Sequence, residues 1–563
     1  MKYKIVIILT LFAAVSCIKD TGNYDYRDIN GLVIDPRTGI KGISGRYNVP
    51  LGERLMITPE LEFTIGEEYG EQRFEWHVLD GSNRSRGVIS RERNLDYIVG
   101  APYTSRQATY QMLYCVYVKA GDKEVRYDQQ FTLIVQDKMM VGFIMICETE
   151  DNFDIELISL YQDTLTQYHN VLDFFQSELP REGITPWDVV CYPDAYSPMV
   201  NRPSDDKGFA IWILTDKGTE RLRVEDYEWR EEYDIRGISM ILDKYLGADQ
   251  KFIATKMNPQ IYSANYSNWI CDTEGNWFWY NITGRANFPV HPVNRHQTSD
   301  APYKAAPFMF GRPDHAAILF NEDENQFEIQ NADATTGYEI MYSKPLVGTE
   351  TFDWQNPNYR LIYMGNRTRE GQGFAIVKNV SNDRYEFLSW NNTSKLSINK
   401  QLRKDFPFDN SKRLEDFLAF VYQPDMTWLY WATEDEIWRI DVNAMDGWVN
   451  ITNEVKPEGH KITVFKTTAC LHRVSGRRDK FPLPLNMNAE QLLICSYDVF
   501  APRGTGGQFA VYNVNRANGR LSLAEHPAFW YDDELPLPPN HYLIDMKWTG
   551  FGKVIGLDYK NVP

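Results

Sequence analysis

Along most of the chain, apolar and polar residues alternate in short runs that end at turn-forming residues, which is the pattern of β-strands. Residues 73–78 (RFEWHV) alternate in this way and end at the turn 80–83 (DGSN). Two longer runs follow at residues 110–119 and 127–135. We predict that residues 32–137 form an immunoglobulin-like β-sandwich of about seven strands around Trp76.

From residue 138 to residue 563 the pattern becomes a repeat of an apolar strand, a polar turn and a strand ending in aromatic residues. The repeat recurs at irregular intervals of about 40 to 65 residues, which predicts a β-propeller of about seven blades, with six or eight as alternatives. Residues 542–559 are expected to form a hairpin that closes the ring. The repeats begin near Gly142, Gly208, Trp269, Phe308, Gly373, Phe417 and Leu492.

Helical periodicity is rare in this all-β pattern. Residues 170–179 (NVLDFFQSEL) carry apolar residues at helical spacing, and residues 238–245 (ISMILDKY) allow one or two further turns. Both segments are expected as insertions on the propeller.

The N-terminus carries a targeting pattern. Two lysines precede the apolar run 5–12 (IVIILTLF), which is too short to span a bilayer, and small residues then lead to Cys17. This predicts a bacterial lipoprotein signal peptide over residues 1–16 and a lipid anchor, with acyl chains such as palmitate, on Cys17. An ordinary secretory signal is the alternative. Residues 17–31 are polar and are expected to form a flexible tether.

Net charge and aromatic content narrow the classes of partner. The formal charge is −18, and a surface of this sign disfavours nucleic acid and anionic lipid headgroups. Aromatic residues make up 14% of the chain. Rings that stack on sugars would account for this share, but packed strands also favour aromatic residues, and packing is the preferred explanation.

Six cysteines remain besides Cys17, and none forms a CxxC spacing, so a zinc site built on cysteine is not expected. Two of them lie within apolar strand patterns, which favours buried free thiols, although an exported protein can also form disulfides. The six are Cys115, Cys147, Cys191, Cys271, Cys470 and Cys495.

The chain contains no HExxH, phosphate-loop, GxSxG or dinucleotide-binding glycine pattern, so no catalytic residue is predicted. Residues 504–507 (GTGG) are interpreted as a loop between strands. The acidic run 322–325 (EDEN) raises the question of calcium, but a solvated hairpin tip is favoured. No metal and no cofactor are therefore expected.

The loop 283–304 concentrates side chains that can bind a ligand, because long loops of a propeller gather at the faces of the ring. Its imidazole and guanidinium groups are suited to carboxylates or to proton transfer, although a surface crossover fixed by prolines is the favoured alternative. The candidate ligand-binding residues are Arg285, His291, Arg295 and His296, with Trp277 and Trp279 from the preceding strands.

Five short stretches of the chain form a recognisable set: residues 17–26 (CIKDTGNYDY), 51–59 (LGERLMITP), 74–76 (FEW), 292–294 (PVN) and 305–307 (AAP). In these stretches the chain resembles the PKD-like lipoproteins of Bacteroidota. The resemblance implies an Ig-like module followed by a propeller-like region, and a link to importers of the SusC/SusD type. Residues 163–165 (DTL) are also similar to the O-glycosylation sequence of exported Bacteroidota proteins, which makes Thr164 a candidate site.

These observations predict a non-catalytic lipoprotein of the outer membrane that binds glycan or other oligomeric nutrients, or docks on their importer. Its expected partners are a TonB-dependent transporter, a SusD-like lipoprotein, and a glycan or peptide oligomer. The expected placement is the cell surface, with a periplasmic orientation as the alternative. The alternative functions are a propeller-fold glycan hydrolase or lyase, and a structural platform for protein interactions.

Overall fold

The computed structural model describes residues 30–34, 46–66, 70–100, 102–104, 108–120, 122–136, 139, 141–161, 164–193, 209–231, 250–262, 265–281, 291–296, 301–311, 316–331, 342–347, 351–368, 371–394, 397–407, 413–423, 426–467, 491–529 and 541–561. The chain divides into two compact units, the first comprising Met1–Val99 and Ala108–Gln136, the second Gly100–Gln107 and Asp137–Pro563. Within the described part, none of the helices has the length and apolar composition needed to cross a membrane.

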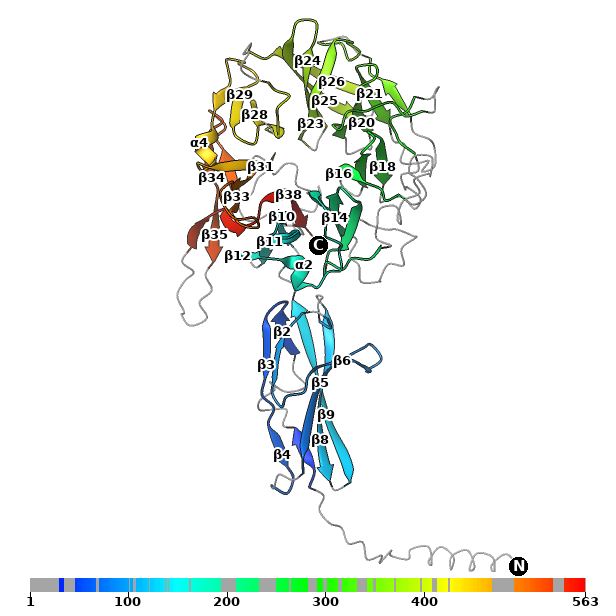
Figure 1. Cartoon of the computed structure of the whole chain (residues 1–563), viewed down its shortest axis with the longest axis vertical. Helices are drawn as coiled ribbons and strands as arrows, with labels where there is room; N and C mark the ends of the chain where they lie inside the picture. Colours follow the sequence, from blue (N-terminus) through cyan, green and yellow to red (C-terminus); the bar gives the residue numbers. More distant parts are fainter. Residues whose placement is uncertain are drawn as a thin grey trace, which may run out of the picture. The chain divides into compact units, whose positions relative to one another are not determined.

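Where the structure describes the first unit, it forms one five-stranded sheet and two two-stranded sheets (Figure 1). In the large sheet, β2 runs parallel to β9, and the other pairs are antiparallel. The large sheet has the order β2 (Arg46–Pro50), β9 (Lys123–Gln136), β8 (Thr109–Ala120), β5 (Gln72–Leu79), β6 (Ser85–Ser90); the small sheets pair β3 (Arg54–Ile57) with β7 (Leu95–Ile98) and β1 (Leu32–Ile34) with β4 (Leu61–Phe63).

Trp76 of β5 lies at the centre of the core of the first unit. Its side chain is fully buried, with ring centroids 4.2 Å from Tyr114 and 5.9 Å from Phe131. The indole N–H donates a hydrogen bond to the carbonyl oxygen of Glu92, which satisfies its polar atom. The predicted sandwich around Trp76 is confirmed.

In the described residues of the second unit, seven sheets of three to five strands follow one another around a ring, and there is one further two-stranded sheet (Figure 1). The predicted propeller of about seven blades is confirmed. Blades 1 to 3 are β38 (Val554–Asn561), β10 (Val141–Glu148), β11 (Phe153–Tyr161), β12 (Thr164–Tyr168); β13 (Pro186–Pro193), β14 (Phe209–Thr215), β15 (Thr219–Arg223); and β16 (Ala254–Tyr262), β17 (Asn265–Asp272), β18 (Trp277–Asn281).

The remaining blades have the same plan. Blades 4 and 5 are β19 (Phe310–Gly311), β20 (Ala316–Asn321), β21 (Gln326–Asn331), β22 (Ser343–Pro345); and β23 (Tyr359–Thr368), β24 (Gln372–Asn379), β25 (Arg384–Ser394), β26 (Ser397–Asp405). Blades 6 and 7 are β27 (Ala419–Tyr422), β28 (Trp428–Ala432), β29 (Ile437–Asp441), β30 (Val449–Asn450); and β31 (His460–Thr467), β32 (Leu492–Asp498), β33 (Gly507–Val514), β34 (Leu521–Leu523), with β37 (Lys547–Phe551) on β33. The two-stranded sheet pairs β35 (Glu525–Phe529) with β36 (His541–Asp545).

The first strand of each blade, as given above, lies nearest the centre of the ring. Several of these innermost strands contact the innermost strand of the next blade: β38 contacts β13 and β31, and β23 contacts β19 and β27. Side chains from different blades therefore meet at the centre.

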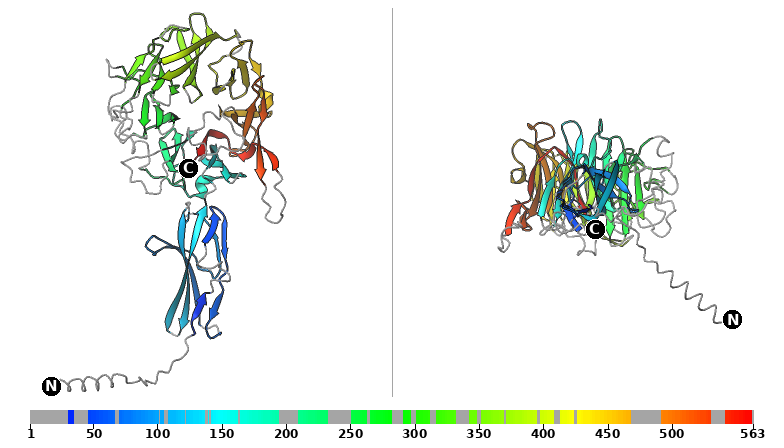
Figure 2. Two further views of the ribbon diagram at one scale, coloured as in Figure 1. Left: turned by 180° about the vertical axis from the view of Figure 1, so that it is seen from behind. Right: turned by 90° about the horizontal axis from the view of Figure 1, so that it is seen from below.

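The ring closes through β38, which pairs antiparallel with β10 and so joins the two ends of the propeller sequence. In Figure 1 and in the left view of Figure 2, the red strand β38 lies among the cyan strands of blade 1. As expected, the segment 542–559 takes part in closing the ring, through β38, but the expectation that it forms a hairpin is wrong. The segment contains three strands, and each pairs with a strand of a different sheet: β36 with β35, β37 with β33, and β38 with β10.

Among the described residues, two short helices accompany the strands, α2 (Val171–Phe174) and α4 (Thr452–Val455). α2 is shorter than the helix expected at 170–179, because Gln176 adopts a left-handed conformation with φ of 53°. The N–H of Ser177 there bonds back to the carbonyl of Leu172, which ends the helix. The segment expected at 238–245 lies outside the described residues.

Five cysteines are free and buried, as predicted: Cys115, Cys147, Cys191, Cys271 and Cys495. Burial raises the pKa of each thiol, that of Cys271 to about 12. Cys470 lies outside the described residues.

We expect these five thiols to be unreactive towards a water-soluble disulfide reagent at pH 8 in the folded protein, because they are neutral and shielded. All should react after unfolding in guanidinium. The check is a thiol titration with and without denaturant. Rapid labelling of any of the five in the native protein, located by mass spectrometry, would contradict their burial.

Candidate functional site

The structure describes only part of the loop 283–304. Arg285 lies outside the described residues. His291 is half-buried, and Arg295 is fully buried, with its guanidinium carbon 5.3 Å from the centre of the Tyr342 ring. The Arg295 carbonyl accepts a hydrogen bond from the N–H of Ser343 in β22. A ligand-binding role for these residues stays a prediction, and Arg295 would have to act from within the protein.

Trp277 and Trp279 of β18 are buried in the core between blades 3 and 4. The Trp277 indole N–H donates to the carbonyl oxygen of Ala306, which ties β18 to the segment that precedes β19. The two rings therefore pack between blades, as the sequence analysis favoured over stacking on a sugar. Their contact with a ligand remains untested.

Two predicted modification sites lie at the margin of what the structure describes. Cys17 is outside the described residues, and so is Asp163 of the DTL sequence. Thr164 is the first residue of β12. Lipidation and O-glycosylation stay predictions.

A more extensive group of accessible side chains lies along the innermost strands, and we call it the inner belt. It combines charged groups from blades 7, 2 and 3 with aromatic rings next to blades 4, 5 and 6. Its members are Lys466, Asp188, Lys256, Phe308, Tyr363 and Phe417.

The charged part of the inner belt begins with an ion pair between β31 and β13. The Lys466 Nζ lies 3.3 and 3.4 Å from the two carboxylate oxygens of Asp188, and the side chains are 33% and 34% exposed. Lys466 also donates to the carbonyl oxygen of Leu557 in β38. Burial raises the pKa of Asp188, while the charge of Lys466 acts in the opposite direction. The pair is thus enclosed by protein and still reached by water.

Gly556 of β38 makes room for this pair. A Cβ at this position would lie 2.5 Å from the Asp188 Oδ1 and 2.8 Å from its Cα. Both are closer than Cβ atoms approach other heavy atoms. The absence of a side chain at Gly556 in β38 therefore leaves the space that Asp188 of blade 2 occupies.

Lys256 of β16 continues the inner belt. Its Nζ lies 4.2 Å from the centre of the Phe308 ring, a cation–π contact, and among the described residues it has no ion pair. The side chain is exposed to water, yet removal from water is the main effect on its ammonium and lowers its pKa. Both observations fit a side chain that is in contact with water but surrounded by protein, as a side chain near the centre of the propeller ring would be.

The aromatic part consists of rings in mutual contact. Phe308 lies 5.1 Å from Tyr363 of β23 and 5.8 Å from Phe417, measured between ring centroids. Tyr363 and Phe417 both contact the buried ring of Phe420 in β27. The rings of Phe308, Tyr363 and Phe417 are only half-buried, so part of their surface is open to a ligand.

This arrangement can bind a ligand that carries both negative charge and apolar faces. An ammonium without an ion pair can donate hydrogen bonds to a carboxylate or sulfate of a ligand. Half-buried rings can stack on the apolar face of a sugar. No local motif marks these residues in the sequence, because six separate strands or loops supply them.

Comparison with known proteins gives these similarities. A model of the PKD-like family matches residues 17–179, and no curated protein matches the chain. Among solved structures, a quinonprotein alcohol dehydrogenase-like protein from Bacteroides thetaiotaomicron is 10% identical, with a TM-score of 0.40, over 86% of this chain and 94% of that one. A DUF4784 family protein from Bacteroides caccae is also 10% identical, with a TM-score of 0.27, over 73% of this chain and 94% of that one.

The propeller itself is established by the strand pairing described above. The family match covers less than half of the chain, namely the first unit and the part of blade 1 up to α2. The N-terminal part of this chain, residues 17–179, is therefore similar to the PKD-like family.

Proposed function

We propose that this chain is a lipid-anchored protein of the bacterial outer membrane whose propeller binds an anionic oligomer, such as an acidic glycan, without catalysis. It would act as an accessory component of a SusC/SusD-type importer. The lipid anchor and the importer are supported by the sequence pattern around Cys17 and by the resemblance to the PKD-like lipoproteins. The class of ligand is supported by the inner belt.

The observation that carries the proposal is the environment of Lys256. The Lys256 ammonium forms no ion pair among the described residues and lies over the Phe308 ring, and the protein around it lowers its pKa. Such a group is expected where binding requires it, because functional sites often retain unfavourable electrostatics. The neighbouring Phe308 and Tyr363 rings add the stacking surface that an oligomeric sugar needs.

We expect Lys256→Met to weaken binding of an acidic polysaccharide about tenfold or more, since one charge-assisted contact is lost. The same change should stabilise the free protein by less than about 1 kcal/mol, because the side chain is largely in contact with water. The gain should be complete below the lowered pKa of Lys256 and vanish as the pH approaches the ordinary lysine value of 10.5. Affinity electrophoresis on polygalacturonate and thermal unfolding at several pH values measure the two effects.

Lys461→Met is the matched control. Lys461 lies on the same innermost strand, β31, as Lys466, but it is paired with Glu434 at 3.0 Å and is outside the inner belt. It should leave retardation on polygalacturonate unchanged. Equal retardation of wild-type protein and Lys256→Met would contradict the proposed ligand site, and release of reducing ends or unsaturated products would contradict the absence of catalysis.

A mild-detergent pull-down of the tagged protein from its own membranes tests the importer. Stoichiometric recovery of a TonB-dependent transporter and its SusD-like lipoprotein is the expected result. Cys17→Ala should lose membrane association in the same preparation. Recovery of the protein alone would count against the importer, even if glycan binding is observed.

A further inference from the structure

Strand β21 separates its polar and apolar residues onto two faces. Phe327 and Ile329 belong to the hydrophobic core between blades 4 and 5. Gln326, Glu328 and Gln330 alternate with them, so they lie on the opposite face, and all three are buried. A buried polar row needs partners, because unpaired polar groups are unfavourable away from water.

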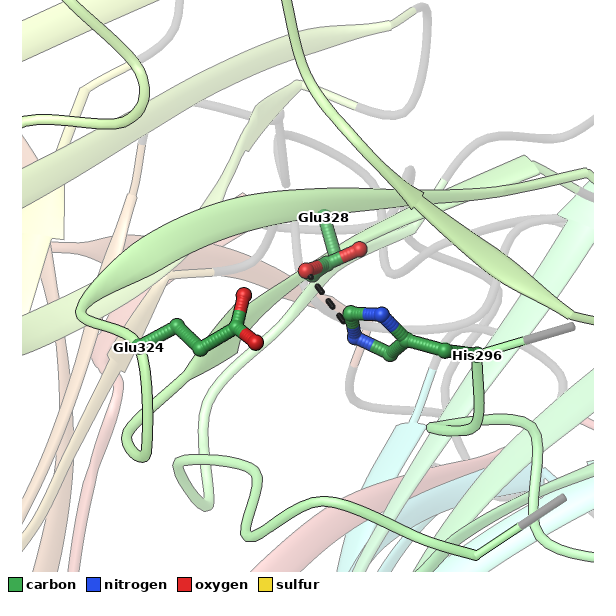
Figure 3. Close-up of side chains that lie close together, drawn as sticks. All are labelled: His296, Glu324 and Glu328. Carbon is green, nitrogen blue, oxygen red and sulfur yellow. Dashed lines mark ion pairs between the residues drawn. The ribbon is translucent and has the colours of Figure 1, made fainter. Parts of the chain in front are cut away.

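Three potential metal ligands meet at this face. Figure 3 shows the Glu328 carboxylate, the carboxylate of Glu324 from the β20–β21 turn and the imidazole of His296 directed towards one another. One ligand atom of each lies within 4.8 Å of the others. The His296 Nε2 is 3.3 Å from the Glu328 Oε1. The two sequence features considered separately, the acidic turn and the histidine loop, are therefore neighbours in space.

The amide of Gln326 lies between the two carboxylates. Its Nε2 donates to the Glu324 Oε2 at 2.5 Å and to the Glu328 Oε1 at 2.7 Å. An amide nitrogen in this position partly compensates two negative charges that face each other. A half-turn of the amide would present its oxygen instead, and would add a ligand atom for a cation.

The Glu328 carboxylate is incompletely satisfied. The side chain is fully buried, and its Oε2 has no hydrogen-bond partner among the described residues. A positive ion next to the carboxylate would compensate the missing donor directly.

We propose that His296, Glu324 and Glu328 bind one divalent transition-metal ion, with the amide oxygen of Gln326 as the fourth ligand after the amide has turned. The site lies on the outer strands of blade 4, separate from the residues of the inner belt. One imidazole nitrogen with two carboxylates is a ligand set suited to Zn²⁺. Ca²⁺, by comparison, prefers ligands that are all oxygen.

The ion would join segments that the sequence separates. His296 lies in the connection between blades 3 and 4, whereas Glu324 and Glu328 lie in the second hairpin of blade 4. Because the ion binds the folded arrangement and not the unfolded chain, it should stabilise the propeller.

The test is titration of the full chain with Zn²⁺ by calorimetry, after treatment with a chelator and with a purification tag that contains no histidine. We expect one Zn²⁺ per chain and a higher unfolding temperature in its presence. Glu324→Gln and His296→Ala should each weaken binding at least tenfold. Glu324 is exposed, so its replacement should leave the fold intact.

Glu322→Gln is the matched control, because Glu322 lies in the same turn but forms an ion pair with Lys304 at 2.7 Å. The Glu322→Gln variant should bind Zn²⁺ with the affinity of the wild-type protein. Absence of Zn²⁺ binding would overturn the proposal, as would Zn²⁺ binding that survives both Glu324→Gln and His296→Ala. Binding of Ca²⁺ in place of Zn²⁺ would overturn the assigned ligand chemistry.

Discussion

Removal of residues 554–563 is expected to abolish cooperative folding of the propeller, because it deletes β38 and opens the ring. Val554, Leu557 and Tyr559 belong to the core between blades 7 and 1. Burial of the two aliphatic side chains alone contributes about 3–6 kcal/mol. The net stability of a folded domain is about 5–15 kcal/mol, so the loss is comparable to the whole.

The polar residues of β38 add to this effect, since they join blade 1 to blade 2. The fully buried Lys560 donates to the carbonyl oxygen of Val224 at 2.7 Å, and the Asp558 Oδ2 accepts from the N–H of Cys191 at 2.7 Å. Without β38, the carbonyl of Val224 and the amide of Cys191 lose these partners inside the protein. The strand therefore connects three blades at once.

The measurements are thermal unfolding by circular dichroism and limited proteolysis. A chain that lacks only residues 562–563 is the control, because β38 ends at Asn561, and it should unfold like the wild type. A sharp, unchanged transition in the longer truncation would show that the ring does not depend on β38.

Trp354→Ala is expected to destabilise the propeller by about 3–5 kcal/mol, the usual range for the loss of a large buried aromatic residue. Trp354 is 1% exposed, and its ring centroid lies 4.5 Å from Phe352, 5.1 Å from Phe327 and 5.3 Å from Trp390. These rings fill the space between blades 4 and 5. A glycine, Gly373, leaves room for them, since a Cβ there would lie 2.6 Å from the Trp390 ring.

Two further variants make the Trp354 prediction specific. Trp354→Phe should lose much less stability than Trp354→Ala, because it keeps a ring and removes an indole N–H that has no partner among the described residues. Phe500→Ala should change nothing measurable, because Phe500 is 85% exposed. Denaturant unfolding gives the three free energies. A loss with Trp354→Ala no larger than that with Phe500→Ala would contradict the packing role.

Local apolar and polar patterning, together with its repeat along the chain, was enough to predict the β-sandwich around Trp76, a propeller of about seven blades and the buried thiols. These features depend on which face of a strand is buried, and period two in the sequence reveals that face. Five of the seven predicted repeat starts lie in the second strand of a blade or directly before it, for example Gly142 in β10, Gly373 in β24 and Leu492 in β32. Second strands are the most apolar, because both of their faces pack between blades.

The sequence predicted closure of the ring in the segment 542–559, but only the tertiary structure decided that β38 alone makes this closure and which side chains share a site. Innermost strands carry polar residues such as Lys256 and Asp188 towards the centre, so their apolar pattern is weak and the repeat did not mark them. His296 meets Glu324 and Glu328 although β19 and β20 lie between them in the sequence, and β38 pairs with β10 from the opposite end of the propeller sequence. The periodicity of a strand specifies the face on which a residue lies. Which residue it contacts depends on how segments that are distant in the sequence come together, and no local pattern contains that information.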